Sequence, residues 1–379
     1  MKVLTIAHNA VAESNRRRTE ALSNLPDVKV SLLTPPWWFE EGRRIDVRRA
    51  APWRVGRTVC TGNGTRYLFV TGLIEALRST QPDVIDLFEE PFSLVALQTL
   101  LLRGVLVPSA AVVFYSAVNV QREWRWPYRA IERLTFRHAD GAHAPNQDVP
   151  PILRAKGFLN HKPVSVIPLG VESARFASAK PMDLPAIRRP RIGFVGRLEP
   201  VKGLEVLLDA MQFLTSPASL VLFGDGSEKN RLMPRFKSQH VQVLPPVSYP
   251  DMPAVLKALD VLVLPSVTIL PQHREQFGRV LIEAMAAGVP VVGSSSGAIP
   301  EVIGDAGLVV PERDSRALAQ AIQRVLTEPG LRNGLVERGR VRVRAHFAWP
   351  VIADQTLDLF RSAVAHRRRV TTRLQAVEA

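Results

Sequence analysis

Short runs of apolar, often β-branched residues recur along the chain, and segments in which apolar residues have helical spacing separate them. Such alternation is typical of α/β proteins, in which helices cover the faces of a parallel sheet. The first half of the chain contains five such runs, at residues 3–7, 28–34, 84–87, 111–115 and 164–167. After a Pro/Arg-rich stretch the series starts again, at 192–195, 220–223, 241–244, 261–264, 289–292 and 308–310. The pattern predicts two doubly wound sheets in succession.

A short segment rich in Pro and Gly lies between the two series, at residues 168–171. No periodic pattern crosses it, so it is the predicted connection between two domains. The length of 379 residues also favours two domains, because one hydrophobic core rarely organises more than about 300 residues. Ligands of such sheets bind at the carboxyl ends of strands. Functional residues are therefore expected directly after strands, in a cleft between the domains.

Most of the net charge of +14 lies near the two ends of the chain. Residues 1–170 hold 22 basic against 15 acidic side chains, and residues 361–379 hold 5 against 1. No helix-turn-helix, zinc-finger or RNA-binding signature accompanies this charge, so nucleic acid is not the expected partner. We expect an anionic membrane surface or a phosphorylated acceptor instead. Tryptophans, which favour the membrane interface, occur among the basic residues: Trp37, Trp38, Trp53, Trp124 and Trp126.

Three features bear on the cellular location. The single cysteine, Cys60, cannot form an intrachain disulfide, and no secretory signal pattern is present. The most apolar stretch, residues 94–118, is interrupted in its middle by Arg103 and Pro108, where a membrane span would suffer most. These features predict a cytoplasmic protein, attached at most peripherally to the inner face of the membrane.

Two cations follow the strand predicted at 192–195. The chain continues from Gly196 as Gly-Arg-Leu-Glu-Pro-Val-Lys-Gly, so Arg197 and Lys202 leave the same strand end. Arg offers two parallel hydrogen bonds and Lys a point charge, which together suit a diphosphate whose charge grows as a bond to it breaks. A solvated turn could have the same sequence, and this motif alone does not separate the two interpretations.

A second motif predicts an anion site at the start of a helix. Glu275 precedes Gly278, and a helical pattern then runs through Glu283. Glycine allows a close backbone approach, and the N–H groups at a helix start attract phosphate. Eight residues of separation correspond to about 80° around a helix, so both carboxylates are expected to face one cleft and to accept hydrogen bonds from sugar hydroxyls. A partly buried helix with surface acids is the alternative.

Acidic residues also follow a strand in the first half of the chain. Glu89 and Glu90 come directly after residues 84–87, where they could hold acceptor hydroxyls or help to deprotonate one. Helix capping is the alternative, because acids are favoured at helix starts. The eight histidines show no metal-ligand spacing, and no Asp-x-Asp triplet occurs. We therefore expect neither a metal ion nor a cofactor.

In combination these motifs resemble the family 4 retaining glycosyltransferases, which have the GT-B fold of two facing Rossmann-like domains. The resemblance covers most of the chain. It rests on the loop at 196–203, the Gly-Asp-Gly turn at 224–226, and Glu275 and Glu283 followed by Ala-Met-Ala-Ala-Gly-Val-Pro at 284–290. The segment at 166–172 is similar to the domain connection of that family.

The resemblance also implies a division of the chain. The helical stretch after Trp349 is similar to the segment that returns to the first domain in this fold. The implied N-terminal, acceptor-binding domain therefore comprises residues 1–170 plus about 354–379. The implied C-terminal, donor-binding domain comprises residues 171–353.

The activity implied is transfer of a sugar from a UDP- or GDP-sugar to a hydroxyl of a glycan, glycolipid or small molecule, with retention of configuration and without a metal. Arg197 and Lys202 would bind the donor diphosphate, Glu275 the donor sugar and Glu283 the ribose. The further donor contacts implied are Gly196, Val247 at the nucleobase, and the backbone of Phe277, Gly278, Arg279 and Val280.

The chain departs from the family at three places. The usual glycine-rich loop after the first strand is replaced by Ala-His-Asn-Ala-Val at 7–11, and Asn119 stands where a histidine commonly lies near the donor sugar. Pro246 replaces a usual glycine before the nucleobase turn. Two alternatives therefore stay open: a GT-B phosphorylase or sugar-nucleotide epimerase, and a nucleotide-sugar-binding protein with weakened transfer.

Overall fold

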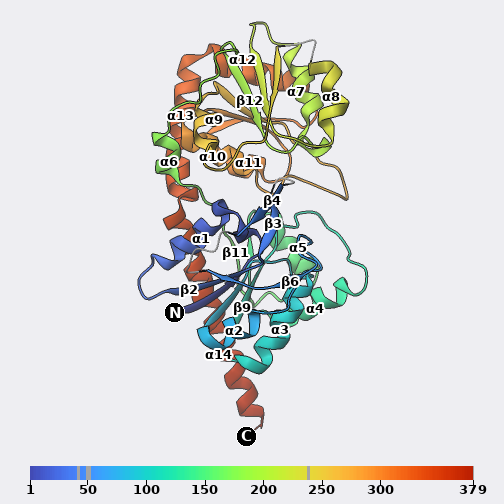
Figure 1. Cartoon of the computed structure of the whole chain (residues 1–379), viewed down its shortest axis with the longest axis vertical. Coiled ribbons are helices and arrows are strands. Elements are labelled where there is room, and N and C mark those ends of the chain that lie inside the picture. The colour runs from blue at the N-terminus through green and yellow to red at the C-terminus, as the bar shows by residue number, and fades with distance from the viewer. Residues whose placement is uncertain (41–42, 48–52, 237–239, 379) are drawn as a thin grey trace. The chain divides into compact units, whose positions relative to one another are not determined.

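The computed structural model describes residues 1–40, 43–47, 53–236 and 240–378. It divides the chain into two compact units, which are coloured along the chain in Figure 1. The first unit comprises Met1–Ile167 and Trp349–Ala379, and the second comprises Pro168–Ala348. The sequence placed the return to the first unit near residue 354. Because helix α14 (Trp349–Glu378) begins five residues earlier, the whole helix belongs to the first unit.

A parallel sheet of seven strands forms the centre of the first unit, in the spatial order β11-β10-β9-β8-β1-β2-β5. The strands are β1 (Lys2–Ile6), β2 (Lys29–Thr34), β5 (Arg54–Val55), β8 (Val84–Leu87), β9 (Ala111–Tyr115), β10 (Gly141–Ala144) and β11 (Val164–Val166). β1 pairs with β2 on one side and with β8 on the other. The strand order therefore reverses between β1 and β8, which is where ligands of doubly wound sheets bind.

The five strands predicted in this half are present, and two further strands of the seven-stranded sheet were missed. β10 reads Gly-Ala-His-Ala and contains no β-branched residue, so it lacks the composition by which the other strands were recognised. β5 has only two residues. Two antiparallel hairpins accompany the sheet: β3 (Trp37–Glu40) with β4 (Arg43–Asp46), and β6 (Thr58–Val59) with β7 (Leu68–Phe69).

Successive residues of the central strands pack on opposite faces of the first sheet. Val3 contacts a core that includes Phe360 of α14, whereas its neighbour Leu4 belongs to a second core that includes Leu77 and Leu100. This alternation is the two-residue period of a strand, and burial on both faces explains the continuous apolar runs in the sequence. The helices of this unit, besides α14, are η1 (Asn9–Val11), α1 (Glu13–Ser23), α2 (Leu73–Thr80), α3 (Leu94–Leu106), α4 (Tyr128–His138) and α5 (Val149–Ala155).

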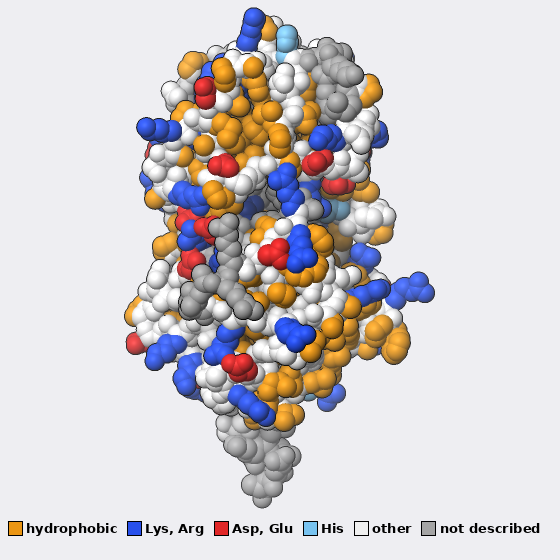
Figure 2. Space-filling model, viewed as in Figure 1, with side chains coloured by type: hydrophobic (Ala, Val, Ile, Leu, Met, Phe, Trp, Pro, Cys, Tyr) orange, Lys and Arg blue, Asp and Glu red, His pale blue; other side chains and the backbone are white. Residues whose placement is uncertain are grey.

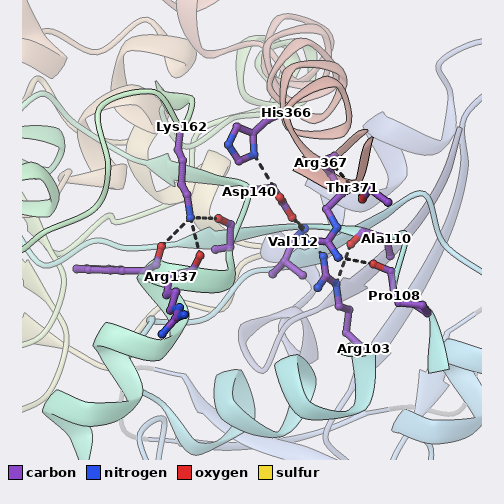
Figure 3. Close-up of polar contacts among 12 residues, drawn as sticks. Arg103, Pro108, Ala110, Val112, Arg137, Asp140, Lys162, His366, Arg367 and Thr371 are labelled. Carbon is purple, nitrogen blue, oxygen red and sulfur yellow. Dashed lines mark hydrogen bonds and ion pairs between the residues drawn. The ribbon is translucent and has the colours of Figure 1, made fainter. Parts of the chain in front are cut away.

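Polar contacts fix α14 to the amino-terminal end of the sheet (Figure 3). Asp140 accepts a hydrogen bond from the Val112 N–H at 2.9 Å, and its other oxygen lies 3.3 Å from Nδ1 of His366. Arg367 donates to the carbonyl oxygen of Pro108 at 2.6 Å. Lys162 donates to three carbonyl oxygens at the end of α4, a position that favours a cation. The contacts of His366 with Asp140 and of Arg367 with Pro108 therefore attach the C-terminal helix, whereas Lys162 binds the end of α4. No motif in the sequence indicated these charges.

The second unit contains a parallel sheet of six strands in the order β14-β13-β12-β15-β16-β17. All six predicted strands are present: β12 (Arg191–Val195), β13 (Ser219–Phe223), β14 (Val241–Leu244), β15 (Val261–Leu264), β16 (Val291–Ser294) and β17 (Gly307–Val310). The strand order reverses between β12 and β15, which places the expected ligand site at their carboxyl ends.

Helices cover the second sheet, and a single hydrophobic core joins it to them. They are α6 (Ser173–Ser178), η2 (Pro200–Lys202), α7 (Leu204–Met211), α8 (Glu228–Phe236), α9 (Met252–Lys257), α10 (Arg279–Ala287), α11 (Ile299–Ile303), α12 (Ser315–Thr327), α13 (Pro329–Arg342) and η3 (Val343–Phe347). Within the described part of the chain, none of the helices combines the length and the apolar character that a membrane crossing requires.

Candidate functional site

The loop after β12 carries Lys202 to the point where the strand order reverses. Gly203 ends this loop with a φ of +66°. A Cβ atom at Gly203 would lie 2.0 Å from the carbonyl oxygen of Pro265, directly after β15, so only glycine permits this approach. The Val267 N–H also donates to the carbonyl oxygen of Val201 at 2.8 Å. These contacts join the loops that follow β12 and β15.

Glu275 is the partner of Lys202. It is 6 % exposed, and its Oε2 atom lies 2.5 Å from Nζ of Lys202 and accepts a hydrogen bond from the Ser266 hydroxyl at 2.8 Å. Burial by itself would raise the pKa of Glu275, but the charge and hydrogen bond of Lys202 and the bond from Ser266 outweigh it, and the pKa is lowered. Glu275 is therefore a buried carboxylate at neutral pH, paired with a cation 73 residues away.

Helix α10 begins at Arg279, four residues after Glu275. Gly278 is the residue before the helix, with a φ of +77°, and it has no side chain to cap the first turn. The N–H groups and positive dipole end of such a helix start suit a phosphate. The Phe277 side chain is buried in the core, with its ring 6.0 Å from that of Phe347, and Val280 packs on the same core. These side chains fix the helix start, and Arg279 is its first residue.

Glu283 lies in the second turn of α10 and is 5 % exposed. The pKa of Tyr249 is raised by burial, by the charge and hydrogen bond of Glu172, and by the charge of Glu283. Tyr249 lies in the loop after β14, two residues from Val247, which packs on the core. Glu283, the candidate ribose contact, thus lies close to the loop that carries Val247, the candidate nucleobase contact. The predicted angle of about 80° between Glu275 and Glu283 around one helix is wrong, however, because α10 begins at Arg279 and does not include Glu275.

Arg197 is exposed, next to half-buried Gly196 at the end of β12. Burial, the charge of Lys202 and the charge of Arg197 all lower the pKa of His273, against the opposing charge of Glu275. These charges therefore act on one imidazole. Its Nε2 atom is buried and has no hydrogen-bond partner among the described residues. No motif in the sequence indicated His273 or Ser266.

In the first unit, Glu89 lies at the reversal between β1 and β8 and is 1 % exposed. Its Oε1 atom accepts from the His8 N–H at 2.7 Å and from the Tyr67 hydroxyl at 2.6 Å, and its Oε2 atom lies 2.6 Å from His8 Nδ1. Burial and then the charge and hydrogen bond of Glu89 raise the pKa of Tyr67. Helix capping is not the role of this acid, because Ser93 caps α3.

Glu90 holds the loop that follows β9. It accepts hydrogen bonds from the Ser116 hydroxyl and the Ala117 N–H, both at 2.8 Å. Burial raises its pKa to about 7, although both hydrogen bonds act in the opposite direction. Asn119 lies buried in the same loop, at 3 % exposure. Glu90 therefore positions the segment that carries Asn119.

His8, the partner of Glu89, lines a small cavity of about 100 Å³. Asn9, Asn15 and Trp38 line the same cavity. The imidazole ring lies 4.4 Å from the Trp38 ring. In the sequence, His8 stood out only as part of an unusual loop. Its place directly after the first strand was the signal that could have assigned it to the site.

The comparisons with known proteins bear on the second unit most directly. Residues 189–328 match the family model described as glycosyl transferases group 1. Residues 189–328 form a group 1 glycosyltransferase domain. This confirms the resemblance to glycosyltransferases and places Arg197, Lys202, Glu275 and Glu283 inside the group 1 domain.

A relative by sequence is the D-inositol 3-phosphate glycosyltransferase of Acidothermus cellulolyticus, which is 35 % identical over 231 residues. The match covers 55 % of this chain and 50 % of that protein. The chain thus spans about half the length of the curated relatives that it matches first.

Solved structures match nearly the whole chain. The sucrose-phosphate synthase of Thermosynechococcus elongatus has a TM-score of 0.71 at 22 % identity, with 96 % of this chain and 99 % of that chain covered. HepE of Anabaena in complex with UDP and glucose has a TM-score of 0.69 at 16 % identity, with 96 % and 100 % covered. Together with the two parallel sheets, these matches confirm the predicted GT-B fold.

Proposed function

We propose that this chain is a retaining, family 4 glycosyltransferase that uses a UDP- or GDP-sugar. The acceptor is a hydroxyl of a glycan, glycolipid or small molecule, as in the synthesis of polysaccharides and other glycoconjugates. The observation that carries the proposal is the buried pair of Lys202 and Glu275 beside the start of α10. A cation and a helix N-terminus suit a diphosphate, and a carboxylate suits sugar hydroxyls.

Each group has its own part in the proposed reaction. The bond between C1 of the sugar and the diphosphate oxygen breaks, and Arg197 and Lys202 stabilise the negative charge that develops on that oxygen. The acceptor hydroxyl forms the new bond to C1 from the same side, and its proton passes to the departing diphosphate. Glu275 accepts hydrogen bonds from sugar hydroxyls and so orients C1.

The ion pair explains how a carboxylate can lie at an anion site. Lys202 neutralises Glu275, so an incoming diphosphate meets the positive charge of Arg197 and of the helix dipole rather than an unpaired carboxylate. The buried Nε2 atom of His273 offers a further hydrogen bond to a ligand.

The test is an assay of transfer and slow donor hydrolysis with UDP- and GDP-sugars, followed by NMR of the anomeric configuration of the product. We expect the configuration of the donor, and an unchanged rate in excess chelator, because cations and N–H groups replace the charge of a metal. An inverted product would contradict retention. Loss of activity with chelator, restored by magnesium or manganese, would contradict the metal-free mechanism.

Two further outcomes would identify the alternatives. Formation of a sugar 1-phosphate that depends on added phosphate would identify a phosphorylase. Binding of the donor without turnover on any acceptor would identify a binding protein.

A further inference from the structure

An apolar cavity of about 770 Å³ opens between α2 and α3 of the first unit. Hydrophobic side chains gather over these two helices in Figure 2. Three of the lining residues are themselves exposed apolar side chains: Val70 at 61 %, Ile74 at 47 % and Leu101 at 60 %. The lining includes none of the residues of the candidate functional site. Its volume lies within the range of about 300–1,000 Å³ that is typical of small-molecule sites.

The polar groups in the wall of the cavity already have partners. The Gln98 side chain accepts from the Phe69 N–H at 3.0 Å and donates to the Phe69 carbonyl oxygen at 2.7 Å. The Ser79 hydroxyl donates to the carbonyl oxygen of Glu75 at 2.7 Å. A sugar or a nucleotide would find few hydrogen bonds here, whereas an aliphatic chain gains from apolar burial alone.

The charges at the cavity favour an anion at one end of such a chain. Its charged lining residues are Glu75 and Arg78. Arg54 lies 3.1 Å from Glu75 and neutralises it. Arg78 is exposed, and within the described ranges it forms no ion pair. The net charge beside the cavity is therefore positive.

We propose that this cavity binds one aliphatic chain of an anionic lipid, with the head group at Arg78. The apolar lining and the volume of the cavity suit the aliphatic chain, and the unpaired Arg78 suits the anionic head group. The assignment goes beyond the proposed function, since it adds a second ligand and does not depend on the donor site.

The proposal can be tested with single-chain amphiphiles on the full chain, below the concentrations at which they form micelles. Hexyl, octyl and decyl phosphate are titrated by calorimetry, with the alkyltrimethylammonium ions of equal length as cationic controls. We expect the dissociation constant to fall about fourfold for each added methylene group, because each is buried in the cavity. The phosphates should bind several-fold more tightly than the cations.

Three variants locate the ligand. Leu101→Asp places a charge in the cavity wall and should weaken decyl phosphate binding more than tenfold. Val105→Asp is the matched control, because Val105 lies one turn further along α3, is 80 % exposed and does not line the cavity. Arg78→Gln should remove the preference for phosphate while the dependence on chain length persists.

Several outcomes would overturn the proposal. These are affinity that does not change with chain length, equal affinity for both head groups, or equal effects of Leu101→Asp and Val105→Asp, which would indicate an open surface patch. Self-association that Leu101→Asp abolishes, without amphiphile binding, would assign the face to a second copy of the chain. Donor turnover is measured separately on each variant. A failure of the proposed transferase activity can therefore be distinguished from a failure of amphiphile binding.

Discussion

Lys202 and Arg197 have different surroundings, which allows catalysis to be separated from stability. Replacing either residue with alanine should lower kcat about 10- to 150-fold, because a charge-assisted hydrogen bond contributes about 1.5–3 kcal/mol and gains most as the diphosphate leaves. Lys202→Ala also leaves the buried Glu275 without its cation, so the Tm of the second unit should fall. Arg197→Ala should leave the Tm unchanged, because Arg197 is exposed.

Steady-state kinetics and thermal unfolding of the same variants check this prediction. Glu283→Ala is the kinetic control, since a ribose contact is made equally in the ground and transition states and should chiefly raise KM. The double variant should lose less than the product of the single losses, because both cations act on one leaving group. Wild-type turnover of both single variants on saturating donor would mean that the loop after β12 is only a solvated turn.

Glu90 makes the stability of the first unit depend on pH. Its pKa is raised from 4.5 to about 7, so the folded state keeps a proton that the unfolded state loses. Stability should therefore fall as the pH rises from about 4.5 through 7, in total by on the order of 2 kcal/mol. In Glu90→Gln this loss should disappear, which Tm measurements of both proteins across the pH range would reveal. A constant difference in Tm at every pH would contradict the raised pKa.

At the scale of elements, one glycine sets how the loop after β12 meets the loop after β15. Gly203→Ala would place a Cβ atom 2.0 Å from a carbonyl oxygen at a residue with positive φ. The loop that carries Lys202 must then move, and we expect kcat to fall more than tenfold with a loss of about 1–3 kcal/mol of stability. Gly330→Ala in α13 is the control, because nothing lies within 4 Å of its Cβ position. If both variants retain wild-type kinetics, the close approach is not needed for the site.

At the scale of the whole molecule, the excess of basic side chains lies mainly in the first unit, which contains 27 Lys and Arg against 18 Asp and Glu. We expect this unit to bind anionic vesicles, with weaker binding once salt reduces the Debye length below about 10 Å. Sedimentation with anionic and neutral vesicles over a salt series would measure this. Equal binding to both kinds of vesicle would contradict an electrostatic attachment.

The structure changes which tryptophans can contribute to such binding. Trp126 is 84 % exposed and remains a candidate, so Trp126→Ser should weaken vesicle binding. Trp38 is 9 % exposed and packs against His8, and its proposed membrane contact is wrong. Trp124 packs against Phe92 with ring centres 3.9 Å apart and the rings tilted by 32°, while Trp37 and Trp53 are half-buried.

The sequence by itself determined the two parallel sheets and the loops that carry the candidate residues. Strand period, helical spacing and the punctuation by Pro and Gly are local properties, and they can be read without knowing which strands are neighbours. The strand β10 was missed for the same reason, since its Gly-Ala-His-Ala sequence has no local strand character and its place is decided by burial between β9 and β11.

Only the tertiary structure decided which charges meet. Lys202 and Glu275 are 73 residues apart, and His8 and Glu89 are 81 apart. Each pair forms because the strand order reverses between β12 and β15 or between β1 and β8, which places distant loops at neighbouring strand ends. The tertiary structure likewise sets two pKa values. Burial raises the pKa of Glu90, whereas Lys202, distant in the sequence, lowers the pKa of Glu275 against the effect of burial, because the free energy of a charge depends on everything that surrounds it.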